Sequence, residues 1–89
     1  MTEIFTTKEG YTNSYTDVEL ISTTNARFDS MVGTLGKLEY RKGIGAFFDN
    51  IKRYVYTSAV KEVDLEEHEG FIYVTLTTLN SIYKFKVKN

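Results

Sequence analysis

Cysteine, proline and tryptophan are absent from this 89-residue sequence, and histidine occurs once. Without cysteine the chain has neither a disulfide framework nor a thiolate metal site. A small domain without cross-links is typical of a reducing compartment, so we expect a cytoplasmic protein. The start of the chain, MTEIFTTKEG, lacks the basic and apolar regions of a secretory signal. No apolar run approaches the roughly 20 residues of a membrane-spanning helix, so we expect no membrane contact.

An excess of one charge is also missing, because 11 Lys and Arg face 12 Asp and Glu and the formal net charge is -1. The chain as a whole is therefore not drawn to phosphate backbones, and any nucleic-acid role needs a local basic patch. The length predicts a single domain over residues 1–89, too small for a deep catalytic cleft between domains.

What the sequence does contain favours a β-sheet: seven Tyr, six Phe and twelve Thr. Residues 71–77 and 81–87 are β-prone runs separated by a short segment that contains Asn80, and they predict an antiparallel hairpin. In the second run apolar and polar side chains alternate. Residues 58–65 predict a third strand, joined to this hairpin by a charged turn at 66–70, and shorter strands are expected at 18–22 and 35–40. The polar segment 8–16 predicts a loop or loosely held arm.

The segment 46–56 fits two structures. Phe47, Phe48, Ile51, Tyr54 and Val55 follow the three-and-four spacing of a helical stripe. However, Asp49-Asn50 can form a turn between two β-prone runs, and good helix formers are scarce here, so we favour a hairpin. The expected fold is all-β or mainly β: a small barrel or sandwich of about six short antiparallel strands, with one short helix near 46–55 as the alternative.

Three blocks of the sequence, residues 36–40, 57–60 and 77–85, carry the pattern TS-x-V followed by T-x-NS-x-Y-x-F in the last two. The segment 33–87 thereby resembles small uncharacterised β-rich proteins of Gram-positive bacteria, their phages and mobile elements. The resemblance implies a phage or mobile-element accessory protein and supplies no catalytic residue. Independently, Thr57-Ser58 and Asn80-Ser81 are expected to fix corners of the sheet by side-chain hydrogen bonds to the backbone.

Motifs with catalytic or metal-binding potential fail on spacing or context. Residues 33–37, GTLGK, have two residues between the glycines where a phosphate-binding loop needs four, so a tight turn into a strand is expected. His68 stands among Glu66, Glu67 and Glu69, where a solvated turn is more typical than a metal site. We therefore predict no enzyme, no metal and no cofactor.

A basic patch is the basis of a nucleic-acid interpretation. Residues 41–48, RKGIGAFF, look like the base-stacking strand of RNA-recognition and cold-shock domains, but Ile44 and Ala46 occupy positions that hold aromatic residues in those families. The residues that would contact phosphate or nucleic acid are Lys37, Arg41, Lys42, Lys52 and Arg53.

Acidic and aromatic residues are the basis of a protein-binding interpretation. Five carboxylates between 62 and 69 can line one side of the last three strands while Lys84, Lys86 and Lys88 line another, and such an acidic strip can imitate a nucleic-acid backbone. Tyrosine suits interfaces because its ring is apolar and its tip polar. The predicted partner-binding residues are Glu62, Asp64, Glu66, Glu67, Glu69, Tyr54 and Tyr56.

These observations predict a non-enzymatic binding module, a phage or mobile-element protein that inhibits or modulates a host protein such as a defence nuclease. The alternatives are an oligomer that sequesters a nucleotide signal in an intersubunit pocket and a nucleic-acid-binding small barrel. The expected partner is a protein, self-association into a homo-oligomer is a further expectation, and nucleotide or nucleic acid ranks behind both.

Overall fold

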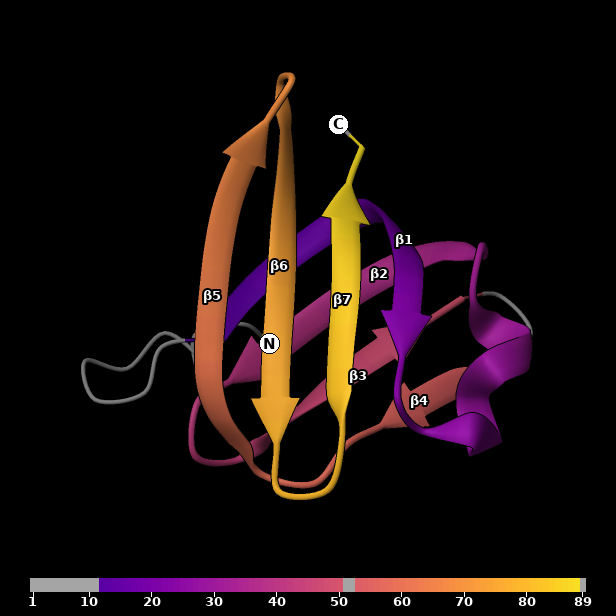
Figure 1. Cartoon of the computed structure of the whole chain (residues 1–89), viewed down its shortest axis with the longest axis vertical. Coiled ribbons are helices and arrows are strands. Elements are labelled where there is room, and N and C mark those ends of the chain that lie inside the picture. The colour runs from indigo at the N-terminus through magenta and orange to yellow at the C-terminus, as the bar shows by residue number, and fades with distance from the viewer. Residues whose placement is uncertain (1–11, 51–52, 89) are drawn as a thin grey trace.

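The computed structural model describes residues 12–50 and 53–88, which form one antiparallel sheet of seven strands and a short 3₁₀ helix. The elements are β1 (Thr12–Thr23), η2 (Ala26–Met31), β2 (Leu35–Arg41), β3 (Gly45–Asp49), β4 (Tyr54–Tyr56), β5 (Val60–His68), β6 (Phe71–Thr78) and β7 (Ile82–Val87). Their order in the sheet is β4-β3-β2-β1-β7-β6-β5 (Figure 1). The mainly β prediction is confirmed, with one strand more than expected.

Strand β1 bends and thereby folds the sheet onto itself. Its first residues pair with β2 and its last residues pair with β7, and a bulge separates Tyr15 from Val18. Asp17 in this bulge has a positive φ of 53°, a conformation that short polar residues adopt more readily than bulky ones. We call β4, β3, β2 and the start of β1 the back half, and the end of β1 with β7, β6 and β5 the front half. Figure 1 shows the front half lying across the back half.

The hydrophobic core lies between the two halves. Strict alternation on β2, β3, β6 and β7 sends every second side chain inward. Phe48 of β3 and Phe85 of β7 meet across the core with their ring centroids 5.3 Å apart. The buried hydrophobic residues are Val18, Leu20, Met31, Leu38, Tyr40, Ala46, Phe48, Val55, Val60, Val74, Leu76, Tyr83, Phe85 and Val87. Each half therefore contributes one apolar face and leaves its outer face to solvent.

The sheet is folded but not closed into a barrel. A single parallel bridge joins Lys42 to Val60, and the Gly43 amide donates to the Val60 carbonyl oxygen at 2.9 Å. In the part of the chain that the structure describes, β4 and β5 each have only one neighbouring strand in the sheet. The architecture is thus nearer to the expected sandwich than to the expected barrel.

The segment 46–56 forms the hairpin of β3 and β4, so the favoured interpretation is confirmed over residues 46–50 and 53–56. The short helix occurs elsewhere, at η2, where Asn25 caps it by accepting a hydrogen bond from the Arg27 amide at 3.0 Å. The alternative of a helix near 46–55 is wrong for the described part of that segment, because β-sheet pairing with β2 outweighs the helical spacing of its apolar residues.

Three local predictions need correction. Residues 12–16 belong to β1 rather than to a loose arm, because they pair with β2; residues 8–11 lie outside the described residues. The turn expected at 66–70 comprises only residues 69–70, because β5 continues to His68. As predicted, the Thr57 side chain fixes its corner by a hydrogen bond to the backbone. The corner between β6 and β7 is held by Thr78, whose hydroxyl donates to the Ser81 carbonyl oxygen and accepts from the Ser81 N–H. The side chains predicted for this role were those of Asn80 and Ser81.

Candidate binding surfaces

Three aromatic rings form a cluster on the outer face of the back half. The ring centroid of Phe47 lies 5.3 Å from that of Tyr54 and 4.7 Å from that of Tyr56, and the two tyrosine centroids are 5.7 Å apart. Tyr54 is 59% exposed and Tyr56 is 68% exposed. We call Phe47, Tyr54 and Tyr56 the aromatic cluster. Large apolar area that packs together yet stays in solvent is typical of a binding surface.

The register of β3 and β4 explains why these rings face outward. Phe48 pairs with Val55, and both side chains are buried in the core. Because successive side chains on a strand point to opposite faces, their neighbours Phe47, Tyr54 and Tyr56 must lie on the outer face. Phe47 pairs with Tyr56, which brings their rings into contact. The cluster is therefore held by the core on the other side of the same two strands.

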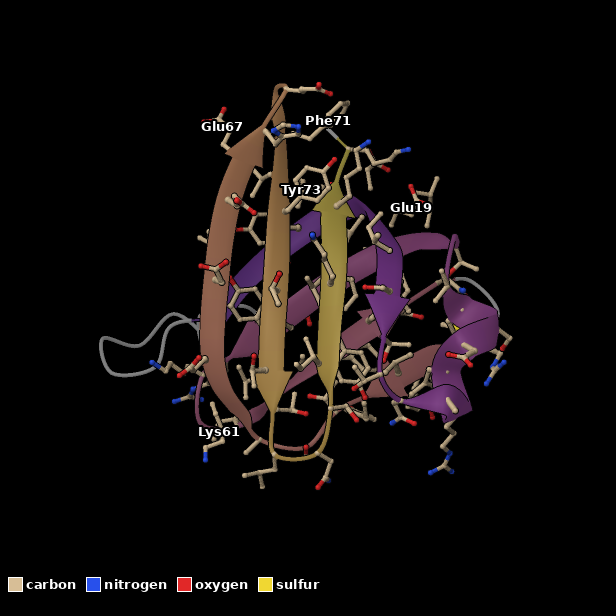
Figure 2. All side chains as sticks on the ribbon, viewed as in Figure 1. Glu19, Lys61, Glu67, Phe71 and Tyr73 are labelled. Atoms are coloured by element: carbon tan, nitrogen blue, oxygen red, sulfur yellow. The ribbon has the colours of Figure 1, made fainter. Side chains whose placement is uncertain are left out.

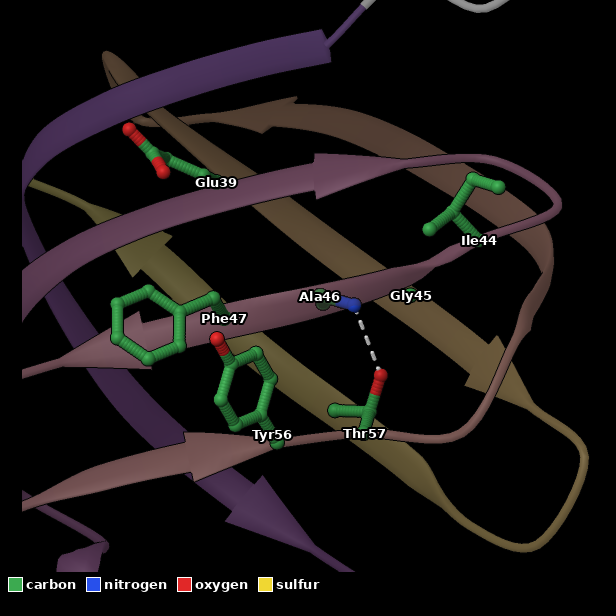
Figure 3. A pocket seen from close by; sticks show the side chains of 7 residues that line it. All are labelled: Glu39, Ile44, Gly45, Ala46, Phe47, Tyr56 and Thr57. Carbon is green, nitrogen blue, oxygen red and sulfur yellow. Dashed lines mark hydrogen bonds between the residues drawn. The ribbon is translucent and has the colours of Figure 1, made fainter. Parts of the chain in front are cut away.

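A surface hollow of about 380 Å³ adjoins the cluster (Figure 3). Its lining residues are Glu39, Ile44, Gly45, Ala46, Phe47, Tyr56 and Thr57. Gly45 takes an outward position on β3 and has no side chain to fill the space, and a Cβ there would lie 3.2 Å from the Thr57 carbonyl oxygen. Thr57 holds this part of the strand pair, since its hydroxyl accepts the Ala46 N–H at 2.9 Å. The hollow gives the flat sheet face a recess for a partner side chain.

Charges around the aromatic cluster are balanced. Lys37, Glu39 and Arg41 alternate with buried residues on β2 and so share the outer face, and Asp49 takes the outward position on β3 opposite Lys37. The two cations and two carboxylates cancel, and the described residues include no ion pair among these four. The cluster thus lies in a polar surface without a field of one sign.

The predicted phosphate-binding residues do not converge on one site. Lys37 and Arg41 lie on the outer face of β2 with Glu39 between them. Lys42 lies beyond the strand at the bridge to Val60, and the Arg53 guanidinium donates to the Ser30 hydroxyl at 2.8 Å, toward η2. Lys52 falls outside the described residues. A continuous basic patch is therefore not formed by the four described members of this set.

The outer face of the front half carries charge in separate columns. The register aligns side chains in rows across the three strands. Asp64, Thr75 and Lys84 form one row, and Glu66, Tyr73 and Lys86 form another, with the β6 residue in the middle of each. On β5, β6 and β7 the outward side chains are Glu62, Asp64, Glu66, His68, Phe71, Tyr73, Thr75, Thr77, Ile82, Lys84 and Lys86, and on β1 Glu19 takes the outward position beside Lys86. We call this surface the charged face; Figure 2 looks onto it, with Tyr73 on its middle strand.

The lysines of this face contact rings rather than the carboxylates of β5. The Lys86 ammonium lies 4.1 Å from the centroid of Phe71, and the Lys84 ammonium lies 5.6 Å from that of Tyr73. Lys88 pairs with Glu19 of β1, with 3.2 Å between Nζ and Oε1. Within the described residues no β5 carboxylate forms an ion pair with a β7 lysine, since the β6 column separates them by about 9.6 Å, two strand spacings.

The predicted partner-binding residues are divided between distant surfaces. Glu62, Asp64 and Glu66 share the charged face, whereas Glu67 takes the opposite, inward phase of β5 and Glu69 lies in the turn with a φ of 56°. Tyr54 and Tyr56 lie on the outer face of the other half, so the structure does not bring them together with the acidic residues. Period-two alternation and the folding of the sheet therefore place these seven predicted residues on different surfaces.

The described residues contain no group of three or more His, Cys, Asp and Glu placed to hold a metal ion. His68 is exposed, with its Nε2 3.8 Å from Oε2 of Glu69. The only resolved pKa shift among the described groups is in the core, where burial raises the pKa of Tyr40 well above its usual range and the neighbouring Tyr15 adds to the effect. No helix in residues 12–50 and 53–88 has the length and apolarity to cross a membrane.

Comparison of the chain with protein-family models, with curated proteins and with solved structures found no match.

Two residues of this surface are not among the predicted binding residues: Phe47 of the aromatic cluster and Glu39 of the adjoining hollow. Tyr54 and Tyr56 are. The signal was present, because once Phe48 and Val55 are assigned to the core, alternation alone sends Phe47 and both tyrosines outward. Which member of the Phe47-Phe48 pair is buried, however, depends on the register with β2.

Proposed function

We propose that this chain is a non-catalytic binding module that binds a protein partner through the aromatic cluster. The observation that carries the proposal is the mutual packing of Phe47, Tyr54 and Tyr56 on an outward sheet face, with both tyrosines more than half exposed. Aromatic side chains each bury about 150–250 Å² on contact and are enriched among the residues that dominate binding energies.

The packing of the cluster favours binding for a second reason. The rings already contact one another, and β3 holds the cluster through the buried Phe48 on its other face. Side chains that are ordered before binding lose less conformational entropy when a partner covers them. The adjacent hollow beside Gly45 supplies a recess, which is where anchor residues of a partner bind most strongly.

The balanced charge of this surface favours protein over nucleic acid. Nucleic-acid affinity depends on several cations meeting phosphates, yet here Glu39 lies between Lys37 and Arg41, and Asp49 lies opposite Lys37. If bases stacked on the rings, the chain would be a nucleic-acid-binding module instead, and the experiment below distinguishes the two.

For the class of partner we extend the expectation from the sequence that residues 33–87 resemble small β-rich proteins of Gram-positive bacteria, their phages and mobile elements. On that basis we propose a phage or mobile-element protein whose partner belongs to the host, such as a defence nuclease. Occupying a surface of the partner requires no catalytic group of this chain.

The experiment is affinity capture from a Gram-positive host lysate with the wild-type chain and with Tyr54→Ala/Tyr56→Ala, followed by titration of the purified captured protein. We expect the double variant to bind that protein at least about 30-fold more weakly, which corresponds to about 2 kcal/mol. Leu79→Ala is the matched control, because Leu79 is 61% exposed in the loop between β6 and β7, away from the cluster.

The proposal fails if the double variant binds the captured protein as tightly as wild type while retaining its circular dichroism spectrum. It also fails if the wild-type chain binds single-stranded oligonucleotides with a steep salt dependence and captures no protein, since that outcome would assign the rings to bases.

A further inference from the structure

The charged face has a symmetry that the aromatic cluster lacks. Its middle column, β6, is uncharged, and the columns on either side carry opposite charge at matching levels. Asp64 and Lys84 lie level with Thr75, and Glu66 and Lys86 lie level with Tyr73. A rotation of 180° about an axis along β6 would therefore exchange an acidic side chain for a basic one at these two levels.

We propose that a second copy of this chain docks on the charged face, related to the first by a two-fold axis that runs along β6 in the plane between the two faces. In this arrangement Asp64 faces Lys84 of the second copy, and Glu66 faces Lys86 of the second copy. Each contact occurs twice, as in any two-fold interface. Thr75 and Tyr73 of the two copies meet at the centre.

The charges of this face select this occupant and this orientation. The β5 carboxylates form no ion pair in the described structure, and the ammonium groups of Lys84 and Lys86 lie over rings without a carboxylate partner. A two-fold axis across the strands would instead place acidic columns on acidic columns and basic on basic. Only the axis along the strands pairs opposite charges, and like charges in contact disfavour the alternative.

The size of the face predicts a weak dimer. Three strands about 4.8 Å apart and some eight residues long give a footprint of about 400 Å² per copy. A standard interface buries about 800 Å² per partner, so this contact belongs with weak, electrostatically assisted associations. Its stability should therefore depend strongly on salt, because the charges lie at the surface.

A dimer of this kind leaves both aromatic clusters free. The charged face belongs to the front half and the cluster to the outer face of the back half, so the two clusters point away from each other. This consequence, unlike the dimer itself, rests on the proposed function: the dimer would present two binding surfaces and bind a multivalent partner with added avidity.

The test is sedimentation of the wild-type chain and of two charge-reversal variants, Glu62→Lys/Asp64→Lys/Glu66→Lys and Lys84→Glu/Lys86→Glu. Wild type is expected to dimerise at about 0.01 M salt, where the screening length is about 30 Å, and to dissociate at about 1 M, where it is about 3 Å. In each variant alone, the β5 and β7 columns carry charge of the same sign, so two copies repel each other and the variant is expected to be monomeric. An equimolar mixture of the two is expected to form a heterodimer.

Controls separate this interface from general attraction and from the proposed function. Lys37→Glu/Arg41→Glu changes the net charge by the same amount as Lys84→Glu/Lys86→Glu, but both residues lie on the outer face of β2 in the back half. This variant should therefore not form a heterodimer with Glu62→Lys/Asp64→Lys/Glu66→Lys. Tyr54→Ala/Tyr56→Ala should dimerise as wild type does. Wild type that stays monomeric at low salt, or a mixture that fails to associate, would overturn the proposal.

Cross-linking checks the position of the axis. A cysteine introduced as Thr75→Cys lies on the central strand, so a short bis-maleimide should join it to the same residue of the second copy, because facing sheets lie about 10 Å apart. The matched control Lys37→Cys is exposed on the other half and should remain uncross-linked. Equal cross-linking of the two variants would contradict the assigned face.

Discussion

Tyr40 is the residue whose polar atom the core accommodates least well. Its side chain points from β2 into the space between the halves, stacked on Tyr15 with 6.4 Å between ring centroids. Among the described residues, its hydroxyl is the buried side-chain polar atom without a hydrogen-bond partner. Burying a hydroxyl without a partner costs free energy, because water satisfies the group in the unfolded chain.

Tyr40→Phe tests this cost directly. The variant keeps the ring and removes only the hydroxyl. We therefore expect its free energy of unfolding at neutral pH to be no lower than the wild-type value and up to about 1 kcal/mol higher. Urea unfolding followed by circular dichroism measures the difference. Tyr83→Phe is the control, since the Tyr83 hydroxyl accepts a hydrogen bond from Asn25 at 3.2 Å and its removal should destabilise the fold.

The same residue predicts a pH dependence. Burial raises the pKa of Tyr40 above the ordinary value of 10.0, so the folded chain holds this proton at a pH where the unfolded chain releases it. Its contribution to stability is complete below about pH 10 and is lost as the pH rises further. Above pH 10, wild type should lose stability faster than Tyr40→Phe, by up to about 1.4 kcal/mol per pH unit, in urea titrations at stepped pH.

At the scale of single elements, Gly36 sets how closely β2 approaches the end of β3. A Cβ at Gly36 would overlap the carbonyl oxygen of Asp49, a backbone atom that cannot rotate away. We expect Gly36→Ala to lower the free energy of unfolding by about 1–3 kcal/mol, because the strands must separate locally. Chemical denaturation measures this loss. Lys37→Ala, at the exposed neighbouring position, should change stability by less than about 0.5 kcal/mol.

The two edge strands differ in how they resist pairing with other chains. β5 is nine residues long and carries charged side chains along most of its length, which disfavours edge-to-edge association. β4 is limited to three residues, and a strand this short offers few free backbone groups. Both edges are thus protected, which leaves the outer faces as the surfaces available for binding.

At the scale of the whole molecule, stability depends on the contact between the halves. A chain of this length has a total stability of about 4–13 kcal/mol. Phe85 of β7 is 1% exposed and packs on Phe48 of β3, so it joins strands from the two halves. Because both halves share this one core, neither is expected to remain folded when the other unfolds.

Phe85→Ala should therefore destabilise the entire chain by about 3–5 kcal/mol, the range for removal of a buried aromatic ring. Thermal and urea unfolding should show circular dichroism and tyrosine fluorescence changing together, in wild type and variant alike. Ile82→Ala changes a residue of the same strand that is 44% exposed, and it should cost much less. Separate transitions for the two probes would show that the halves fold independently.

Much of the strand content could be predicted, because alternation within a strand depends on neighbouring residues alone. Tyr83, Phe85 and Val87 point inward and Lys84 and Lys86 outward, as their spacing indicates. The hairpin at 46–56 was harder, since its apolar residues also fit a helix and only pairing with β2 decides between them. The bend of β1 at Asp17 escaped prediction, because a polar residue with positive φ looks like part of a loop.

For the candidate surfaces, the sequence by itself determined which residue types are available: tyrosines that flank a core valine, carboxylates two apart on one strand and lysines two apart on another. Only the tertiary structure decided which of them share a surface. Folding of the sheet at β1 places Tyr54 and Tyr56 on one half and Glu62, Asp64 and Glu66 on the other. The physical reason is that side-chain alternation is a local property, whereas the proximity of strands depends on burying both apolar faces in a common core.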